Sequence, residues 1–195
     1  MKRFLHNVSA ILILAATGAF AGVPAFQLRD TTGAVHTPAE WRGQRAILLF
    51  FVTIDCPVGN SYVPELNRIR EAFSGRGVQV YAVQADTTVA DSEVARYAKD
   101  FRYSFPLLLD PQQVLVELTG ATITPQAAVL SPEGKVLYLG RIDNRVADFG
   151  KARPEATVRD LRDALDEVLA GKPVTHPFTK SIGCAINRVH ARSAK

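Results

Sequence analysis

The sequence places one of its two cysteines at the junction between an apolar segment and a candidate helix. Residues 47–52 are apolar and favour a β-strand, Cys56 and Pro57 follow, and residues 61–73 have the pattern of a helix. A thiol at a helix N-terminus lies beside free backbone N–H groups and at the positive end of the helix dipole. This setting favours the reactive thiolate. The alternative is a small buried apolar side chain, which describes many free cysteines.

The N-terminal segment has the pattern of an export signal. Lys2 and Arg3 precede an apolar stretch at 8–20, and Ala19-Phe20-Ala21 offers small residues at both positions of a cleavage site. We expect residues 1–21 to be a signal peptide, the alternative being a retained anchor. Because the stretch is shorter than the about 20 residues of a spanning helix, we expect no stable membrane insertion after cleavage. The expected location is periplasmic or extracellular, and such compartments are oxidising.

The charge pattern argues against nucleic-acid binding. The formal net charge is +4 at pH 7, and two of the positive charges belong to Lys2 and Arg3. Elsewhere acids and bases are interspersed, and only the end of the chain, with Arg188, Arg192 and Lys195, is locally basic. Nucleic-acid binding requires a clustered basic patch. We therefore interpret this end as solvated and expect no nucleic-acid partner.

The second cysteine, Cys184, lies far from Cys56 in the sequence, so the chain has no local C-x-x-C motif. Two cysteines in an exported protein suggest a pair, either structural or redox-active. His176 offers another interpretation, since imidazole and thiolate together suit zinc or copper. A histidine on the surface is the simpler account, and we expect neither a metal nor a cofactor.

The rest of the pattern predicts alternating strands and helices. Strands are expected at 26–28, 46–52, 78–83, 106–109, 126–130 and 136–142. Helical segments are expected at 37–41, 61–73, 91–101, 113–118 and 154–169. Crossovers followed by a hairpin and a last helix indicate an α/β fold. We expect one domain over residues 22–170 and a tail, 171–195, that carries Cys184.

Several motifs resemble those of exported thioredoxin-like redoxins, including the alkyl-hydroperoxide-reductase/thiol-specific-antioxidant group. They are Trp41-Arg42-Gly43 before the strand that leads to Cys56-Pro57, Phe105 to Pro111, and Thr124-Pro125 before an apolar strand and Ser131-Pro132-Glu133-Gly134. The resemblance covers roughly residues 23–169 and implies a thioredoxin-like fold, with a central mixed sheet flanked by helices. It also implies that Pro125 is cis and packs against Cys56. Thr53, Pro57, Thr124 and Pro125 would then form the active-site loop.

The sequence departs from the family pattern at several positions, and these departures limit which activities of the family can be expected of this chain. Gly59 stands where a thioredoxin has its second cysteine, and Asn60 stands where copper-delivering members have theirs. The peroxidase pattern has a proline at the position of Leu49, although Thr53 matches its threonine. The family has an activating arginine near the cis-proline position, and this sequence has Thr124-Pro125 there instead. These departures favour disulfide exchange over peroxide reduction.

The tail supplies a candidate for the missing second thiol. A helix over 154–169 covers about 24 Å, whereas an extended segment from 170 to 184 can span up to about 45 Å. The tail is therefore long enough to return to Cys56. Cys184 then becomes a candidate resolving thiol, the alternatives being a structural disulfide or two independent thiols.

These observations predict an exported thiol-dependent oxidoreductase. We expect Cys56 to attack a disulfide or a peroxide and Cys184 to resolve the product, with a thiol reductant, a disulfide-bearing protein or a small peroxide as partner. A different class of function is a non-catalytic copper-handling module that binds metal through Cys56 and His176, with or without Cys184. A third is a structural redoxin whose buried thiols resist alkylation.

Overall fold

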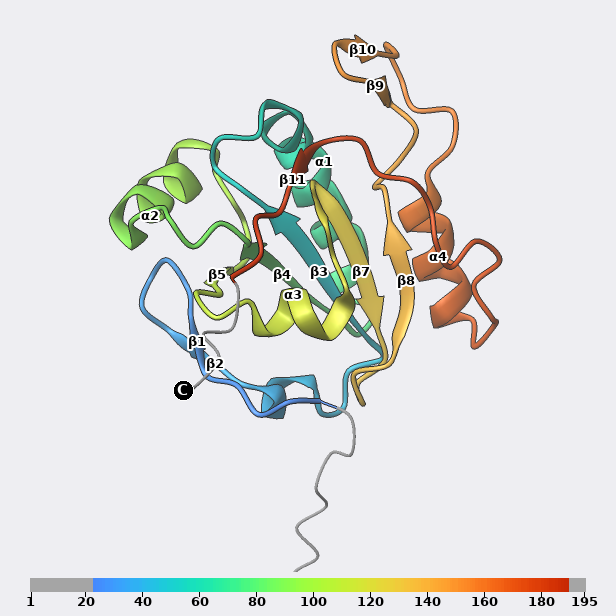
Figure 1. The fold of residues 1–195 in the computed structure, drawn as a ribbon. Coiled ribbons are helices and arrows are strands. Elements are labelled where there is room, and N and C mark those ends of the chain that lie inside the picture. Colours follow the sequence, from blue (N-terminus) through green and yellow to red (C-terminus); the bar gives the residue numbers. More distant parts are fainter. Residues whose placement is uncertain (1–22, 190–195) are drawn as a thin grey trace, which may run out of the picture.

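A five-stranded mixed sheet forms the centre of the protein (Figure 1). The computed structural model describes residues 23–189. The strands lie in the order β5-β4-β3-β7-β8. Their bounds are Leu107–Leu109 (β5), Val78–Gln84 (β4), Ala46–Val52 (β3), Gln126–Leu130 (β7) and Val136–Gly140 (β8). Strands β3, β4 and β5 are parallel, whereas β7 is antiparallel to both β3 and β8. This confirms the expected α/β class and the mixed sheet.

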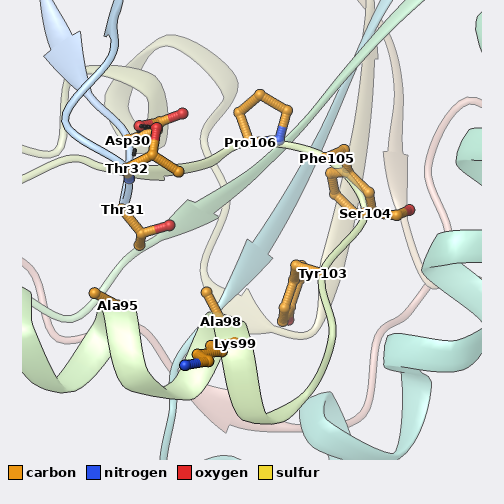
Figure 2. A pocket seen from close by; sticks show the side chains of 10 residues that line it. All are labelled: Asp30, Thr31, Thr32, Ala95, Ala98, Lys99, Tyr103, Ser104, Phe105 and Pro106. Atoms are coloured by element: carbon orange, nitrogen blue, oxygen red, sulfur yellow. Dashed lines mark hydrogen bonds between the residues drawn. The ribbon is translucent and has the colours of Figure 1, made fainter.

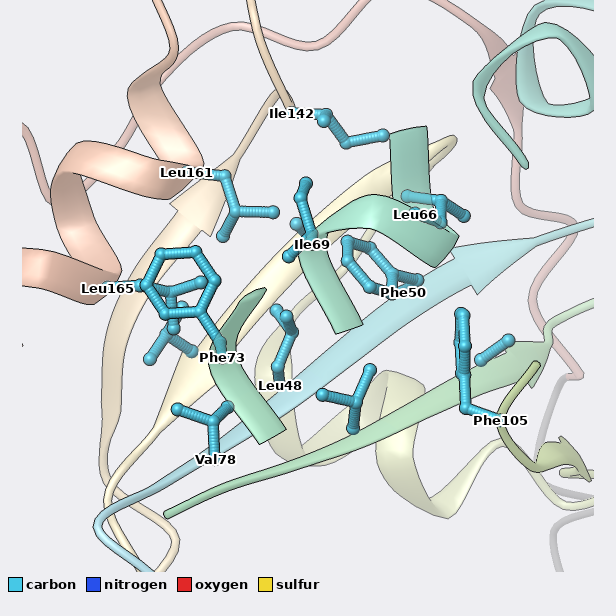
Figure 3. Close-up of a cluster of buried hydrophobic side chains, with 14 of the residues drawn as sticks. Leu48, Phe50, Leu66, Ile69, Phe73, Val78, Phe105, Ile142, Leu161 and Leu165 are labelled. Carbon is cyan, nitrogen blue, oxygen red and sulfur yellow. The ribbon is translucent and has the colours of Figure 1, made fainter. Parts of the chain in front are cut away.

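Helices cover both faces of the sheet because β3 is apolar on both of its sides. Leu48 and Phe50 of β3 face a cluster formed with α1 (Pro57–Ser74), α2 (Asp91–Asp100) and α4 (Asp160–Leu169). Figure 3 shows part of this cluster, with Leu66, Ile69 and Phe73 of α1 packed over the sheet. Alternate residues of β3 face the opposite cluster, which includes Trp41 of the 3-10 helix η1 (Pro38–Trp41) and residues of α3 (Val114–Thr119).

Helix α1 begins earlier than the apolar spacing predicts. The expected start was Ser61, but the helix starts at Pro57 with Cys56 as its N-cap residue. The Cys56 sulfur accepts a hydrogen bond from the backbone N–H of Gly59 at 3.4 Å, and proline suits the first helical position because it has no N–H to satisfy. The first turn, residues 57–60, contains a proline and a glycine and a single large apolar side chain, Val58, so it adds little to the hydrophobic periodicity from which the helix was predicted.

Helix α4 begins later than predicted, at Asp160 instead of Pro154. The side-chain oxygen of Asn144 accepts hydrogen bonds from the backbone N–H groups of Thr157 (2.9 Å) and Val158 (3.1 Å). These bonds hold the segment before the helix in a different conformation. A small hairpin of β9 (Val146–Asp148) and β10 (Lys151–Ala152), which was not predicted, projects from the same end of the molecule (Figure 1).

Four short strands complete the fold. Near the N-terminal end, β1 (Leu28–Arg29) pairs with β2 (Val35–His36) in an antiparallel hairpin. Of greater consequence, β6 (Ile123–Thr124) pairs antiparallel with β11 (Cys184–Ala185), so the tail lies against the body of the domain. Neither β6 nor β11 was predicted, because two-residue strands have no periodicity to detect.

The predicted signal peptide, residues 1–21, lies outside the described residues. Within residues 23–189, none of the helices has both the length and the apolar character needed to span a membrane.

The packing of α1 on the sheet predicts the effect of a core substitution. Leu66, on the buried face of α1, is 0% exposed, so Leu66→Ala removes buried methyl groups and leaves a cavity. We expect a loss of about 2 to 5 kcal/mol in the free energy of unfolding, measured by urea denaturation. Val35→Ala, at a side chain that is 49% exposed, serves as the control and is expected to change it by less than about 0.5 kcal/mol. Equal effects of the two substitutions would contradict this description of the core.

Candidate active site

The two cysteines meet where the C-terminal end of β3 turns into α1. Cys56 is fully buried, at 0% exposure. Its thiol donates a hydrogen bond to the backbone carbonyl of Thr124 at 3.0 Å, while its sulfur accepts one from the N–H of Gly59. The free N–H groups and the dipole of α1 favour negative charge at this sulfur. The Cys56 sulfur therefore contacts both the first turn of α1 and the carbonyl of Thr124.

The loop that was expected to surround Cys56 does so. The peptide bond between Thr124 and Pro125 is cis, as the family resemblance implied. A side chain placed on Gly59 would lie 3.8 Å from the Cys56 sulfur and 3.9 Å from Pro125 Cδ, so these three residues are close neighbours. Thr53, behind Cys56, shares a hydrogen bond with the Thr124 hydroxyl at 3.2 Å.

The tail crosses this site as a strap, by which we mean residues 177–189 (Figure 1). Strand β11 places Cys184 opposite Thr124, the residue whose carbonyl accepts the Cys56 hydrogen bond. The Thr124 hydroxyl also donates a long hydrogen bond, 3.5 Å, to the Cys184 carbonyl. The expectation that the tail returns to Cys56 is confirmed.

The approach of the strap to the site depends on a residue without a side chain. A Cβ atom on Gly183 would lie 2.0 Å from the carbonyl oxygen of Thr124 and 3.0 Å from Pro125 Cδ. Such contacts with backbone atoms are too short to be relieved by a side-chain rotation. Glycine is therefore required next to Cys184 for β11 to pair with β6.

Two sets of contacts fasten the strap on either side of Cys184. Before it, Leu139 of β8 donates its N–H to the Pro177 carbonyl at 2.9 Å, and its carbonyl accepts from Thr179 at 3.2 Å. After it, the buried amide of Gln113 donates to the Asn187 carbonyl at 2.7 Å and accepts from the Val189 N–H at 2.8 Å. Gln113 was predicted only as the start of a helix. Its role depends on residues far away in the sequence, so no local signal reveals it.

The two thiols differ in both exposure and electrostatics. Both are free in this structure, and Cys184 is partly exposed whereas Cys56 is buried. Burial, a hydrogen bond with Cys56 and the charge of Cys56 together raise the pKa of Cys184 to about 11. Cys184 therefore stays protonated at neutral pH.

A tyrosine beside the site was not identified from the sequence. The hydroxyl of Tyr97, on α2, donates to the Asn60 side-chain oxygen at 2.9 Å, and the amide nitrogen of Asn60 donates to the Ile54 carbonyl at 3.1 Å. Burial raises the pKa of Tyr97, and negative charge at Cys56 raises it further, against a hydrogen bond from Tyr103 that lowers it. Asn60 thus connects α2 to the first turn of α1.

A surface cavity of about 430 Å³ lies away from the cysteines, between the loop after β1, helix α2 and the segment before β5 (Figure 2). Asp30 at its rim already accepts hydrogen bonds from the backbone of Thr32 (2.8 Å) and Ala34 (3.0 Å). Its other lining residues are Thr31, Ala95, Ala98, Lys99, Tyr103, Ser104, Phe105 and Pro106. None of these lining residues carries a thiol.

His176 does not join the cysteines. Its side chain is exposed, and it lies close enough to Glu167 for its charge to lower the pKa of that carboxyl group, after the larger effect of hydrogen bonds from Thr175. Among residues 23–189, no three His, Cys, Asp or Glu side chains come together in a way that could hold a metal ion. The structure therefore does not form the three-ligand version of the copper-handling alternative, with Cys56, His176 and Cys184 together.

The close approach at Gly183 gives a direct test of the strap. In Gly183→Ala the new methyl group clashes with the Thr124 carbonyl, so β11 separates from β6. We expect oxidation to a Cys56–Cys184 disulfide to slow by at least about tenfold, because the two Cα atoms no longer lie within disulfide range. The free energy of unfolding should fall by less than about 2 kcal/mol. Ala185→Ser, at an exposed position of the same strand, is the control, and an unchanged oxidation rate in Gly183→Ala would contradict the observed pairing.

Solved structures support the thioredoxin-like fold. A hypothetical protein from Sinorhizobium meliloti 1021 is 30% identical, with a TM-score of 0.71 over 87% of this chain and 93% of that one. The exposed lipoprotein thioredoxin Etrx1 from Streptococcus pneumoniae strain TIGR4 is 20% identical, with a TM-score of 0.57 over 76% of this chain and 99% of that one. The second likeness concerns the fold alone.

Sequence comparisons identify the family. The chain is 26% identical over 113 residues to a thiol-disulfide oxidoreductase ResA from Geobacillus thermodenitrificans (strain NG80-2). That match covers 58% of this chain and 63% of the relative, so the chain spans less than two thirds of the relative's length. The family model described as AhpC/TSA family matches residues 21–139, which is more than half of the chain. This protein is a thioredoxin-like redoxin and belongs to the AhpC/TSA family.

Proposed function

We propose that this protein is a thiol-disulfide oxidoreductase in which Cys56 and Cys184 form one redox pair. The observation that carries the proposal is the pairing of β11 with β6, which brings Cys184 to the residue that accepts the Cys56 hydrogen bond. The pair replaces the C-x-x-C motif that Gly59 interrupts. Its two thiols give up two electrons and two protons to a partner disulfide as the bond between them forms.

In this reaction Cys56 supplies the thiolate. The N–H of Gly59 points at its sulfur, and the first turn of α1 stabilises the negative charge. The bond between Cys56 and Cys184 forms as the partner disulfide breaks, and the leaving partner thiolate takes up a proton from solvent. Thr53, Thr124 and Pro125 hold the sulfur in place, while Pro57 fixes the start of the helix.

Several features favour a disulfide over a peroxide as the substrate. Leu49, where the peroxidase pattern has proline, lies in the middle of β3 and is fully buried. The Thr53 hydroxyl is already bonded to Thr124. The neighbour of Cys56 that can accept or donate electrons is a second thiol. The ResA relatives, described as thiol-disulfide oxidoreductases, point in the same direction.

The partners we propose are a disulfide-bearing or dithiol protein as substrate and a second thiol or disulfide protein that regenerates the pair. The proposed location is the exported compartment implied by residues 1–21, where such exchange has substrates.

Thiol mapping of the protein tests the redox pair. Mild oxidation should produce a monomer in which digestion and mass spectrometry recover a peptide linked through Cys56 and Cys184. Dithiothreitol should reverse the linkage, and insulin reduction should fall by at least about a hundredfold in Cys56→Ser and in Cys184→Ser.

Tyr138→Phe is the control for the assay, because it removes a hydroxyl that contacts the strap at Thr179 but no thiol. The proposal fails if both thiols stay free after oxidation. It also fails if peroxide converts Cys56 to sulfenic acid without recruiting Cys184.

A further inference from the structure

We propose that partner proteins exchange disulfides with Cys184, and that Cys56 exchanges only with Cys184. This inference rests on the proposed redox pair and assigns the point of contact within it. It reverses the order expected from the sequence, in which Cys56 meets the substrate and Cys184 resolves.

Exposure is the first argument. Cys56 is 0% exposed, whereas Cys184, which contacts Cys56 through its side chain, is partly exposed. The Thr124 carbonyl lies 3.0 Å from the Cys56 sulfur, and Gly59 and Pro125 complete its surroundings. A partner sulfur that approaches from solvent therefore meets Cys184 first.

The direction of attack is the second argument. Thiolate attack on a disulfide proceeds in line with the bond that breaks, and its rate depends on which sulfur is accessible. Attack on Cys184, with Cys56 leaving, requires an approach from the solvent side. Attack on Cys56, with Cys184 leaving, requires an approach through the interior, where Thr124 and the start of α1 already lie.

The third argument concerns which sulfur leaves as the negatively charged thiolate when the disulfide breaks. When Cys184 is attacked, the thiolate that leaves is Cys56, at the N-terminus of α1 with the Gly59 N–H directed at it. When Cys56 is attacked, the charge must appear on Cys184, which lies in a strand and whose pKa is raised to about 11. The better leaving group breaks away faster, so both effects select attack on Cys184.

The strap itself shows why Cys56 does not become exposed. Gln113 binds residues 187 and 189 on one side of Cys184. Leu139 binds residues 177 and 179 on the other. Ile186, next to the β11 strand, is buried in the apolar cluster that includes α3. Lifting the strap would break all of these contacts.

The exchange then proceeds in two balanced steps. A partner thiolate attacks the Cys184 sulfur of the oxidised protein, a mixed disulfide forms between partner and Cys184, and Cys56 leaves as a thiolate. A second partner thiolate attacks the partner's sulfur in that mixed disulfide, the partner disulfide forms, and Cys184 leaves and takes up a proton. In the reducing direction Cys184 loses its proton and attacks the partner disulfide, and one partner thiolate leaves. The Cys56 thiolate then attacks the Cys184 sulfur of this mixed disulfide, and the second partner thiolate leaves.

Glutathione mapping tests the assignment. The oxidised protein is mixed with reduced glutathione, quenched with acid within milliseconds to seconds, and digested for mass spectrometry. We expect glutathione on Cys184, at least about tenfold more than on Cys56. With a small aromatic disulfide as probe, reduced Cys56→Ser should react at least about tenfold faster than reduced Cys184→Ser.

A variant of the strap makes the test independent of the cysteine substitutions. Gln113→Ala releases residues 187 and 189, so we expect faster alkylation of Cys56 by N-ethylmaleimide in the reduced protein. Gln112→Ala, at an exposed neighbouring position, is the matched control and should behave as the wild type.

The outcomes separate this inference from the proposed function. If a Cys56–Cys184 disulfide forms and glutathione is found mainly on Cys56, the redox pair stands and the assignment of the contact to Cys184 is wrong. If no such disulfide forms, the proposed function fails and the inference fails with it.

Discussion

The site depends on the burial of β3 on both faces. Its side chains from Ala46 to Val52 are 0 to 1% exposed, because helices α1 and α4 cover one side and α3 covers the other. A strand held in this way cannot shift along its neighbours without exposing apolar surface, and its register with β4 and β7 is fixed. Its end therefore presents Cys56 and the first turn of α1 at one defined position.

The site also requires Cys184 to lie close to Cys56. An irregular segment, the strap, places it there, in contrast to the buried strand that positions Cys56. The strap has little regular secondary structure, and individual contacts hold it in place: a close approach at Gly183, a glutamine amide at Gln113, and backbone bonds to Leu139. The difference between the two thiols follows from this construction. Cys56 belongs to the rigid sheet-helix junction, whereas Cys184 belongs to the layer placed over it, so the two have different exposures and different charges.

The sequence allowed the central strands, the hairpin of β7 and β8 and helix α2 to be predicted almost to the residue, because strong hydrophobic periodicity specifies them. The position of Cys56 and the cis peptide before Pro125 were also predicted, the first from the apolar run before Cys56 and the helical pattern after it, and the second from family resemblance. The start of α4 and the β9–β10 hairpin did not follow, since Asn144 determines them through side-chain bonds to distant backbone groups. The burial of Cys56 beneath the strap could not be predicted from the sequence for the same reason. The length of the tail was nevertheless sufficient to predict that it can reach Cys56.

Strand β11 has a further consequence for the topology of the chain. A bond between Cys56 and Cys184 closes a covalent ring that contains α1, every strand from β4 to β10, and α4. By the chain-entropy description, a ring of this size restricts the unfolded chain by about 4 to 5 kcal/mol. Formation of this bond would thus be thermodynamically linked to folding, because the bond would stabilise the folded state and the folded state would stabilise the bond. A domain with its two cysteines in one helical turn has no such link, because a ring of a few residues restricts the unfolded chain far less.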